Sequence, residues 1–309
     1  MSKENSKLQD LTAENLTRHV IKTCTSNVSN ERTTELISGL IQHLHDYVRE
    51  VQLKPGEWEA GWQYLTETGQ FCTPDRQEMV LLSDVLGISA LVDTINSAQA
   101  RSSIATESSV LGPFHNDADV LENGASIGSE GVIGEPMLIH GTVKSTDGEP
   151  IQGATVDVWE TNGNGFYDMQ DPNRDGPDCR GIFRTDEQGR YYLLGVKSVD
   201  YNIPNEGPVG KLLKILDRNV TRPAHVHFQL RHPDYLDLTT ALYSSESDHI
   251  TTDPVFGVKT SLVKDFQKFD RLPEKVLGYD LRSSPLAQPE SVAKNGIWSL
   301  EHDFVLLRK

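Results

Sequence analysis

Cysteine is scarce in this 309-residue sequence, which contains only Cys24, Cys72 and Cys179. Three cysteines so far apart exclude a disulfide framework and a cysteine-based zinc knuckle. No apolar run approaches the roughly 18 residues needed to cross a bilayer. The polar N-terminal stretch "MSKENSKLQDLTAENL" also has no apolar signal-peptide core. We therefore expect a cytoplasmic protein that does not insert into membranes.

Basic residues are outnumbered, because 29 Lys and Arg accompany 45 Asp and Glu and the formal net charge is −16. Binding to nucleic acid requires clustered cations that neutralise phosphates. The charge balance therefore argues against a nucleic-acid partner. It favours solubility and carries no information about the fold.

The first 110 residues are predicted to form a helical domain. In "TTELISGLIQHLHDYVREV" the apolar residues recur at helical spacing and draw one stripe, and Pro55-Gly56 ends the pattern. The stripe consists of Leu36, Ile37, Leu40, Ile41, Leu44, Tyr47, Val48 and Val51. A further helix is predicted over "TPDRQEMVLLSDVLGISALVDTI", with Thr73 as its cap and Pro74 at its first position.

Residues 111–309 have a different pattern, which begins near Gly112-Pro113. Short alternating stretches such as "MLIHGTVKS", "ATVDVWET", "RYYLLGV" and "HVHFQL" are separated by turn clusters such as "TDGEP" and "TDEQGR". This pattern is typical of an antiparallel β-sandwich or barrel. The predicted fold class is therefore α+β, with a helical N-terminal domain followed by an antiparallel β-sandwich catalytic domain.

Two histidines lie two residues apart in "RPAHVHFQL". Side chains at i and i+2 of a strand share one face, so His225 and His227 could bind the same metal ion. A zinc or copper site would need a further ligand. The nearby candidates are His232, Asp234, Asp237 and His249, but the sequence contains no HExxH or CxxC motif. At this point a metal-free β-sandwich that only binds ligands or partners also stays open, with both histidines hydrogen-bonded and half-buried.

Three motifs in fixed order narrow these alternatives. "VDVWETNGNGFYD", "YNIPNEGPVGKLL" and "RPAHVHF" resemble the intradiol ring-cleaving dioxygenases, and "LLSDVLGISALVD" and "VLGPF" extend the resemblance over roughly residues 30 to 300. The resemblance implies an enzyme that holds non-haem Fe(III) with Tyr167, Tyr201, His225 and His227. It also implies a homodimer formed through the N-terminal helices, with a bound phospholipid.

The chemistry of this donor set is consistent with Fe(III). Phenolate is a hard anionic donor, and because a free tyrosine has a pKa of about 10, its ionisation at neutral pH requires a nearby cation. Fe(III) with two phenolates and one hydroxide is neutral, which suits a buried site. The resemblance implies that Tyr201 accepts a substrate proton and that Arg222 stabilises developing negative charge. Strict alternation from His225 would place Arg222 on the opposite face, although Pro223 interrupts the register.

The substrate is predicted from finer features. "YNIPNEGPVG", "GPF" and "VFGVK" resemble the branch of the family that cleaves hydroxyquinol (benzene-1,2,4-triol) with O2 to 3-hydroxy-cis,cis-muconate, equivalent to maleylacetate. By this resemblance the aromatic ring lies among Leu81, Asp84, Val110, Leu111, Gly112, Pro113, Phe114, Ile203, Pro204, Arg222 and Val255.

Two positions bear on the choice of substrate. Asp84 could accept a hydrogen bond from the third hydroxyl group, or it could be a surface or helix-capping carboxylate. Catechol-cleaving relatives often have Gln where "LTTALYS" has Ala241, which weakens catechol as a substrate and leaves one contact of the site unassigned. Catechol, cleaved to cis,cis-muconate, remains the alternative substrate.

Overall fold

The computed structural model describes residues 10–74, 76–99, 102, 104–171, 176–281 and 296–309. The chain divides into two units, residues 1–66 and 67–309. None of Cys24, Cys72 and Cys179 forms a disulfide bond. Every helix in the described part of the chain is too short or too polar to span a bilayer.

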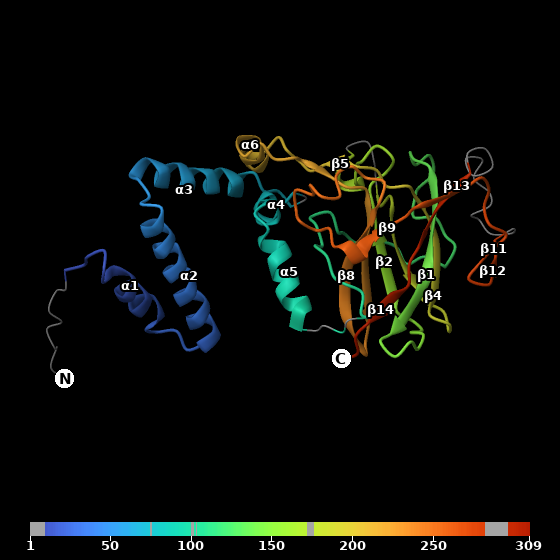
Figure 1. Ribbon diagram of the computed structural model, residues 1–309, viewed down its shortest axis with the longest axis horizontal. Coiled ribbons are helices and arrows are strands. Elements are labelled where there is room, and N and C mark those ends of the chain that lie inside the picture. Colours follow the sequence, from blue (N-terminus) through green and yellow to red (C-terminus); the bar gives the residue numbers. More distant parts are fainter. Residues whose placement is uncertain (1–9, 75, 100–101, 103, 172–175, 282–295) are drawn as a thin grey trace. The chain divides into compact units, whose positions relative to one another are not determined.

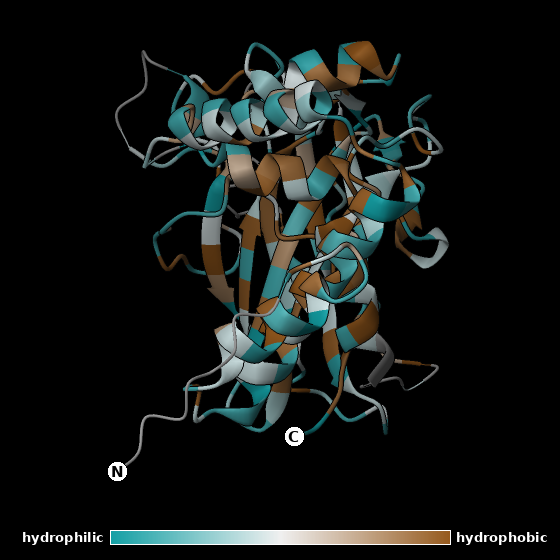
Figure 2. Ribbon diagram, turned by 90° about the vertical axis from the view of Figure 1, so that its left-hand side faces the viewer, coloured by the Kyte–Doolittle hydropathy of each residue, from teal (hydrophilic) through white to brown (hydrophobic). Residues whose placement is uncertain are grey.

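The first unit contains helices α1 (Leu16–Thr25) and α2 (Glu31–Glu50) and most of α3 (Pro55–Gln70). Asn30 caps α2 by accepting a hydrogen bond from the backbone N–H of Thr33 at 2.8 Å. The predicted apolar stripe lies on α2 and, apart from the half-buried Ile41, its residues are exposed in the single chain. Figure 2 colours hydrophobic residues brown and hydrophilic residues teal, and both colours occur along the helices, which is typical of amphipathic helices. Within the first unit, the stripe is therefore not buried by the neighbouring helices.

The predicted helix from Thr73 is wrong in its start and in its continuity. Helix α4 begins only at Glu78 and spans Glu78–Val85, because Thr73 and Arg76 instead pair their backbones in a tight turn. A second helix, α5 (Ile88–Gln99), follows a break at Gly87, whose φ of +74° is incompatible with a continuous α-helix. Glu78 accepts a hydrogen bond from the N–H of Val209 at 3.0 Å, which ties α4 to the start of α6 (Pro208–Ile215).

The remainder of the second unit is a sandwich of two five-stranded sheets (Figure 1). The first sheet contains β1 (Pro136–Ser145), β4 (Arg190–Val196), β10 (Gln267–Phe269), β13 (Ile297–Glu301) and β14 (Phe304–Leu306). The second has the order β3 (Arg180–Arg184), β2 (Thr155–Trp159), β7 (His225–His232), β8 (Tyr235–Ser244) and β9 (Val263–Lys264). Two-stranded ladders join β5 (Tyr201–Asn202) to β6 (Thr221–Arg222) and β11 (Lys275–Val276) to β12 (Tyr279–Asp280). Two short 3₁₀ turns, Asp168–Gln170 and Thr260–Leu262, complete the unit.

The sheets are mixed, which corrects the prediction of a purely antiparallel sandwich. β1 pairs in parallel with both β13 and β14, and β8 pairs in parallel with β9. Strands joined by a tight hairpin must be antiparallel, but β13 and β14 reach β1 from a distant part of the chain and can run in either direction. The alternation in the sequence therefore indicated the strands and not their relative directions.

Strand alternation separates the core from the candidate site. Val226, Phe228 and Leu230 on β7 are fully buried and pack in the core between the two sheets, together with Val156 and Val158 of β2. The intervening residues of β7, starting with the two histidines, project from the other face of the sheet. The candidate site therefore lies on the face of this sheet that points away from the sandwich core.

Candidate metal centre

The two histidines of β7 converge as expected. The Nε2 atoms of His225 and His227 are 3.0 Å apart, and both side chains are buried. Nδ1 of His225 donates a hydrogen bond to the carbonyl oxygen of Pro223 at 2.6 Å, which leaves a lone pair on its Nε2. Burial and the nearby charge of Arg222 lower the pKa of His225 to about 3, and burial also lowers the pKa of His227 well below its ordinary value. Both imidazoles are therefore neutral and can act as ligands.

The two predicted tyrosines meet opposite the histidines. The hydroxyl groups of Tyr167 and Tyr201 are 3.3 Å apart, and both rings are buried. The ring centroids are 5.6 Å apart for Tyr201 and His225 and 6.5 Å apart for Tyr167 and His227, so the four rings enclose one centre. Burial, reinforced by the hydroxyl group of Tyr201, raises the pKa of Tyr167 well above its ordinary value. A cation is therefore needed to stabilise its phenolate.

The alternative zinc or copper ligands do not join this centre. Within the described residues, no group of three or more His, Cys, Asp or Glu side chains could hold a metal ion. His232 approaches Asp234 at 3.9 Å, Asp237 pairs with Arg231 at 3.7 Å, and His249 contacts Thr252. A donor set of two imidazoles and two phenols fits a hard trivalent cation better than a zinc site built of Cys, His and carboxylates.

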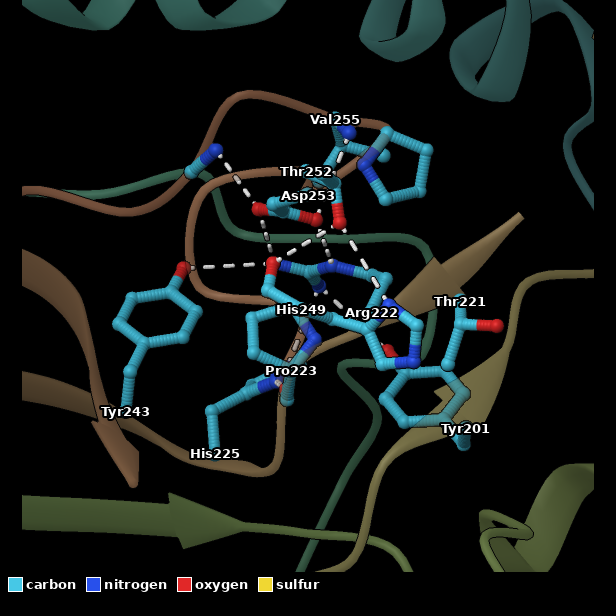
Figure 3. A network of polar contacts seen from close by, with 12 residues as sticks. Tyr201, Thr221, Arg222, Pro223, His225, Tyr243, His249, Thr252, Asp253 and Val255 are labelled. Carbon is cyan, nitrogen blue, oxygen red and sulfur yellow. Dashed lines mark hydrogen bonds and ion pairs between the residues drawn. The ribbon is translucent and has the colours of Figure 1, made fainter. Parts of the chain in front are cut away.

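Arg222 faces the same centre, despite the expectation from strict alternation. It belongs to the short strand β6 and not to β7, and it lies directly opposite Tyr201 on β5. Residues directly opposite in an antiparallel pair project from the same side. One terminal nitrogen, NH1, lies 3.4 Å from the Tyr201 hydroxyl and 3.2 Å from Nε2 of His225 (Figure 3). The inward orientation of Arg222 therefore follows from cross-strand pairing.

Several predicted pocket residues border this centre. Phe114 stacks on Tyr167 with centroids 4.6 Å apart, and a Cβ on Gly112 would lie 3.6 Å from Cε1 of His227. Leu81, Val110, Phe114, Ile203 and Val255 are buried, Gly112, Pro113 and Pro204 are partly buried, and Leu111 is exposed.

Asp84 is 4% exposed near the end of α4, so it is neither a surface residue nor an N-terminal cap. Burial raises its pKa, against a hydrogen bond from Ser89 and the charge of Arg222. The charge of Asp253 acts in the opposite direction to that of Arg222 and also raises the pKa of Asp84.

Comparison with known proteins gives the family. Residues 111–283 match the family model described as Dioxygenase, and residues 30–103 match the model described as Catechol dioxygenase N terminus. An intradiol ring-cleavage dioxygenase, hqdA, from Aspergillus niger is 43% identical over 97% of this chain and 86% of its own length. The chain belongs to the intradiol ring-cleaving dioxygenases.

Two further relatives of this dioxygenase carry a more specific name. A hydroxyquinol 1,2-dioxygenase from Rhizobium sp. is 41% identical over 90% of each chain. The crystal structure of a hydroxyquinol 1,2-dioxygenase from Pseudomonas putida DLL-E4 superposes with a TM-score of 0.84 at 35% identity, covering 96% of this chain and 99% of that one. The dioxygenase fold is therefore shared along nearly the whole chain.

The site of this dioxygenase also contains residues that sequence reasoning missed. Trp159 lies opposite His227 on β2, and Tyr243 lies opposite His225 on β8. Asp253 forms a buried ion pair with Arg222. Trp159 and Asp157 alternate in "VDVW", which could have suggested that they share a face. The order of the strands, which the sequence does not reveal, is needed to bring Trp159 and Tyr243 next to the histidines.

Proposed function

We propose that this dioxygenase cleaves the ring of hydroxyquinol between its two adjacent hydroxylated carbons, using Fe(III) held by Tyr167, Tyr201, His225 and His227. The observation that carries the proposal is the buried set of four donors, with the two histidine Nε2 atoms 3.0 Å apart and the two tyrosine hydroxyls 3.3 Å apart. The names of two similar relatives support hydroxyquinol as the substrate.

Charge balance favours a trivalent ion. Two neutral imidazoles and two phenolates leave one positive charge on Fe(III), which one hydroxide neutralises, and a neutral centre is the least costly form in a buried site. When bound, Fe(III) supplies a Lewis acid that holds the two adjacent substrate oxygens and activates the ring for attack by O2. Both oxygen atoms enter the product, so that no external reductant is required.

The two tyrosines take different roles. Tyr167 is held beneath the stacked ring of Phe114, which favours a fixed ligand. Tyr201 lies beside the Arg222 guanidinium, which stabilises its oxygen as an anion until it accepts a proton from the incoming diol. The same guanidinium then lies where negative charge develops on the substrate oxygens during ring opening.

Recognition of the third hydroxyl group is assigned to Asp84. Its carboxyl is buried on α4 and can accept a hydrogen bond from a hydroxyl that catechol lacks. The product is then 3-hydroxy-cis,cis-muconate, equivalent to maleylacetate. Catechol, cleaved to cis,cis-muconate, is the alternative substrate because the four-donor centre would accept either diol.

The exposed stripe of α2 is assigned to a homodimer contact. Its large apolar side chains are exposed in the single chain, and burying them against a second copy would remove them from water. Family resemblance further supports a phospholipid bound among these N-terminal helices. Neither assignment affects the chemistry of the metal centre.

Colour and oxygen uptake test the function. Charge transfer from tyrosinate to Fe(III) should make the purified protein red-brown, with one iron per chain by metal analysis. Stoichiometric O2 uptake should be fast with hydroxyquinol and slower with catechol. A colourless protein containing zinc, or an iron protein that consumes no O2 with either compound, would refute the proposal. Faster uptake with catechol would move the assignment to the alternative substrate.

A further inference from the structure

The guanidinium of Arg222 is held along one edge by Asp253 and Tyr243, and its other edge faces Tyr201 and His225. Its Nε donates to Oδ1 of Asp253 at 3.0 Å, and its NH2 lies 3.4 Å from Oδ2 of the same carboxylate. NH2 also donates to the Tyr243 hydroxyl at 3.3 Å (Figure 3). The remaining nitrogen, NH1, faces Tyr201 and His225. A planar fork held at Nε and NH2 cannot rotate, so the direction of NH1 is determined.

The hydrogen bonds beyond Arg222 have only one consistent direction. The carbonyl oxygen of Gly257 can only accept, so the hydroxyl of Ser109, 2.7 Å away, must donate to it. Arg222 can only donate, so the Tyr243 oxygen accepts from it. The Tyr243 proton is then directed to Ser109, whose oxygen is 3.1 Å away. The chain of donors therefore runs from Arg222 through Tyr243 and Ser109 to Gly257.

The loop from Asp253 to Gly257 closes this arrangement on itself. The backbone N–H of Gly257 donates to Oδ2 of Asp253 at 2.9 Å, so the residue that ends the donor chain also orients the carboxylate at its start. A Cβ at Gly257 would lie 2.6 Å from the Tyr243 hydroxyl oxygen and 3.1 Å from NH2 of Arg222. A side chain at position 257 would therefore displace the Tyr243 hydroxyl or the Arg222 guanidinium, and glycine allows the loop backbone to approach both groups closely.

Strand β8 supplies the Tyr243 contact from an unexpected position. Ala241 lies opposite His227 and offers no polar group, whereas Tyr243 lies opposite His225 on the same face of the strand. The polar contact from this face of β8 therefore comes from Tyr243, and it is made to Arg222.

We propose that Tyr243, Ser109 and Asp253 are positioning residues that together hold NH1 of Arg222 toward the metal centre. The catalytic meaning of this network rests on the proposed function, in which Arg222 stabilises developing negative charge. The network itself is a property of the fold and can be measured without turnover.

A cycle of variants tests the network. Tyr243→Phe keeps the ring beside His225 and removes only the hydroxyl, and Ser109→Ala removes the next link. Each should lower kcat for hydroxyquinol about tenfold, which corresponds to about 1.4 kcal/mol, with KM changed less than about twofold and iron content unchanged. The double variant should be no slower than the slower single variant, because both substitutions break the same chain.

Tyr191→Phe is the matched control. Tyr191 is also fully buried, and its hydroxyl donates to the carbonyl oxygen of His302 at 2.8 Å in the other sheet. Its loss should lower the denaturation midpoint without changing kcat. If Tyr243→Phe merely resembles this control, or if the double variant multiplies the two losses in kcat to about a hundredfold, the network does not position Arg222.

Unfolding of the same variants separates the two proposals. In urea, the Tyr243→Phe/Ser109→Ala double variant should unfold at the midpoint of the less stable single variant. If the parent protein turns over neither hydroxyquinol nor catechol, the proposed function fails. The urea midpoint of the double variant then tests by itself whether Tyr243 and Ser109 belong to one network. If the midpoint of the double variant falls by the sum of the two single-variant decreases, the two residues act independently and the proposed network is refuted, whatever the result with substrate.

Discussion

Trp159 and His227 lie directly opposite each other on antiparallel strands β2 and β7, and their rings stack with centroids 4.8 Å apart at an angle of 4°. The Nδ1 atom of His227 has no hydrogen-bond partner among the described residues. For His225, the carbonyl of Pro223 fixes the orientation of the ring. For His227, the indole plane performs this task by packing, which makes Trp159 part of the support of the proposed metal centre.

Trp159→Leu should therefore weaken metal binding. The loss of a fully buried ring should cost on the order of 3 kcal/mol of folding stability and free the imidazole of His227 to rotate. Iron content and the charge-transfer band of the purified variant would measure the effect. Trp159→Phe, which keeps a stacking ring, is the control and should retain iron. Full iron occupancy and an unchanged band in Trp159→Leu would contradict the supporting role.

The two tyrosines should respond differently to removal of their hydroxyls. Tyr167→Phe should lose iron or nearly all activity, because Tyr167 is assigned as a permanent ligand. Tyr201→Phe should keep iron and some colour from Tyr167 while losing the group that takes up the substrate proton. Visible spectra and kcat of both variants provide the comparison. Normal turnover by Tyr201→Phe would show that its assigned role is wrong.

Asp84→Leu should separate the two candidate substrates. A carboxylate that accepts a hydroxyl hydrogen bond contributes about 1.5–3 kcal/mol, or roughly 10- to 100-fold in kcat/KM. The variant should lose this factor with hydroxyquinol and much less with catechol. Asp84→Asn retains an acceptor oxygen and should show a smaller loss. Equal losses on both substrates would assign Asp84 a purely structural role in α4.

The α2 stripe should determine the oligomeric state. Replacing both Leu40 and Leu44 by Asp would place two charges in the proposed dimer contact, so the variant should elute from a sizing column as a smaller or aggregated species. Val120→Asp with Ile133→Asp changes two exposed apolar residues outside α2 and serves as the control. If the α2 variant keeps the parent's elution volume and full activity, the stripe is not a dimer contact.

His302 should make stability depend on pH. Burial lowers its pKa from 6.5 to about 4, with the charge of Lys264 acting in the same direction. Its neutral form is therefore favoured by folding. The contribution is complete above pH 6.5 and is lost as pH falls from 6.5 toward 4, by up to about 3 kcal/mol.

His302→Gln removes this proton-binding step while keeping the backbone carbonyl that Tyr191 uses. The free energy of unfolding, measured in urea at pH 7 and pH 5, should fall less in the variant than in the parent. The other buried histidines are present in both proteins and cancel in the difference. An equal fall in both proteins would exclude His302 as the source.

Local pattern indicated most of the elements and the two histidine ligands, although it missed the break between α4 and α5. The helical spacing of apolar residues from Leu36 to Val51 predicted α2, and the alternation in "HVHFQL" placed His225 and His227 on one face. These features depend on the geometry of a few consecutive residues, which the sequence specifies directly. The identity of Tyr167 and Tyr201 as partners came from family resemblance, because no local rule connects residues so far apart.

Tertiary structure decided the contacts between those elements. The parallel pairing of β1 with β13 and β14, the inward direction of Arg222 and the approach of Trp159, Tyr243 and Asp253 all depend on which strands become neighbours. Pairing between distant segments is selected by the packing of the whole core, and one sequence pattern is compatible with several strand orders and directions. The sequence by itself therefore determined which residues could form the metal centre, whereas the strand order determined how Arg222 and the aromatic rings around it are held.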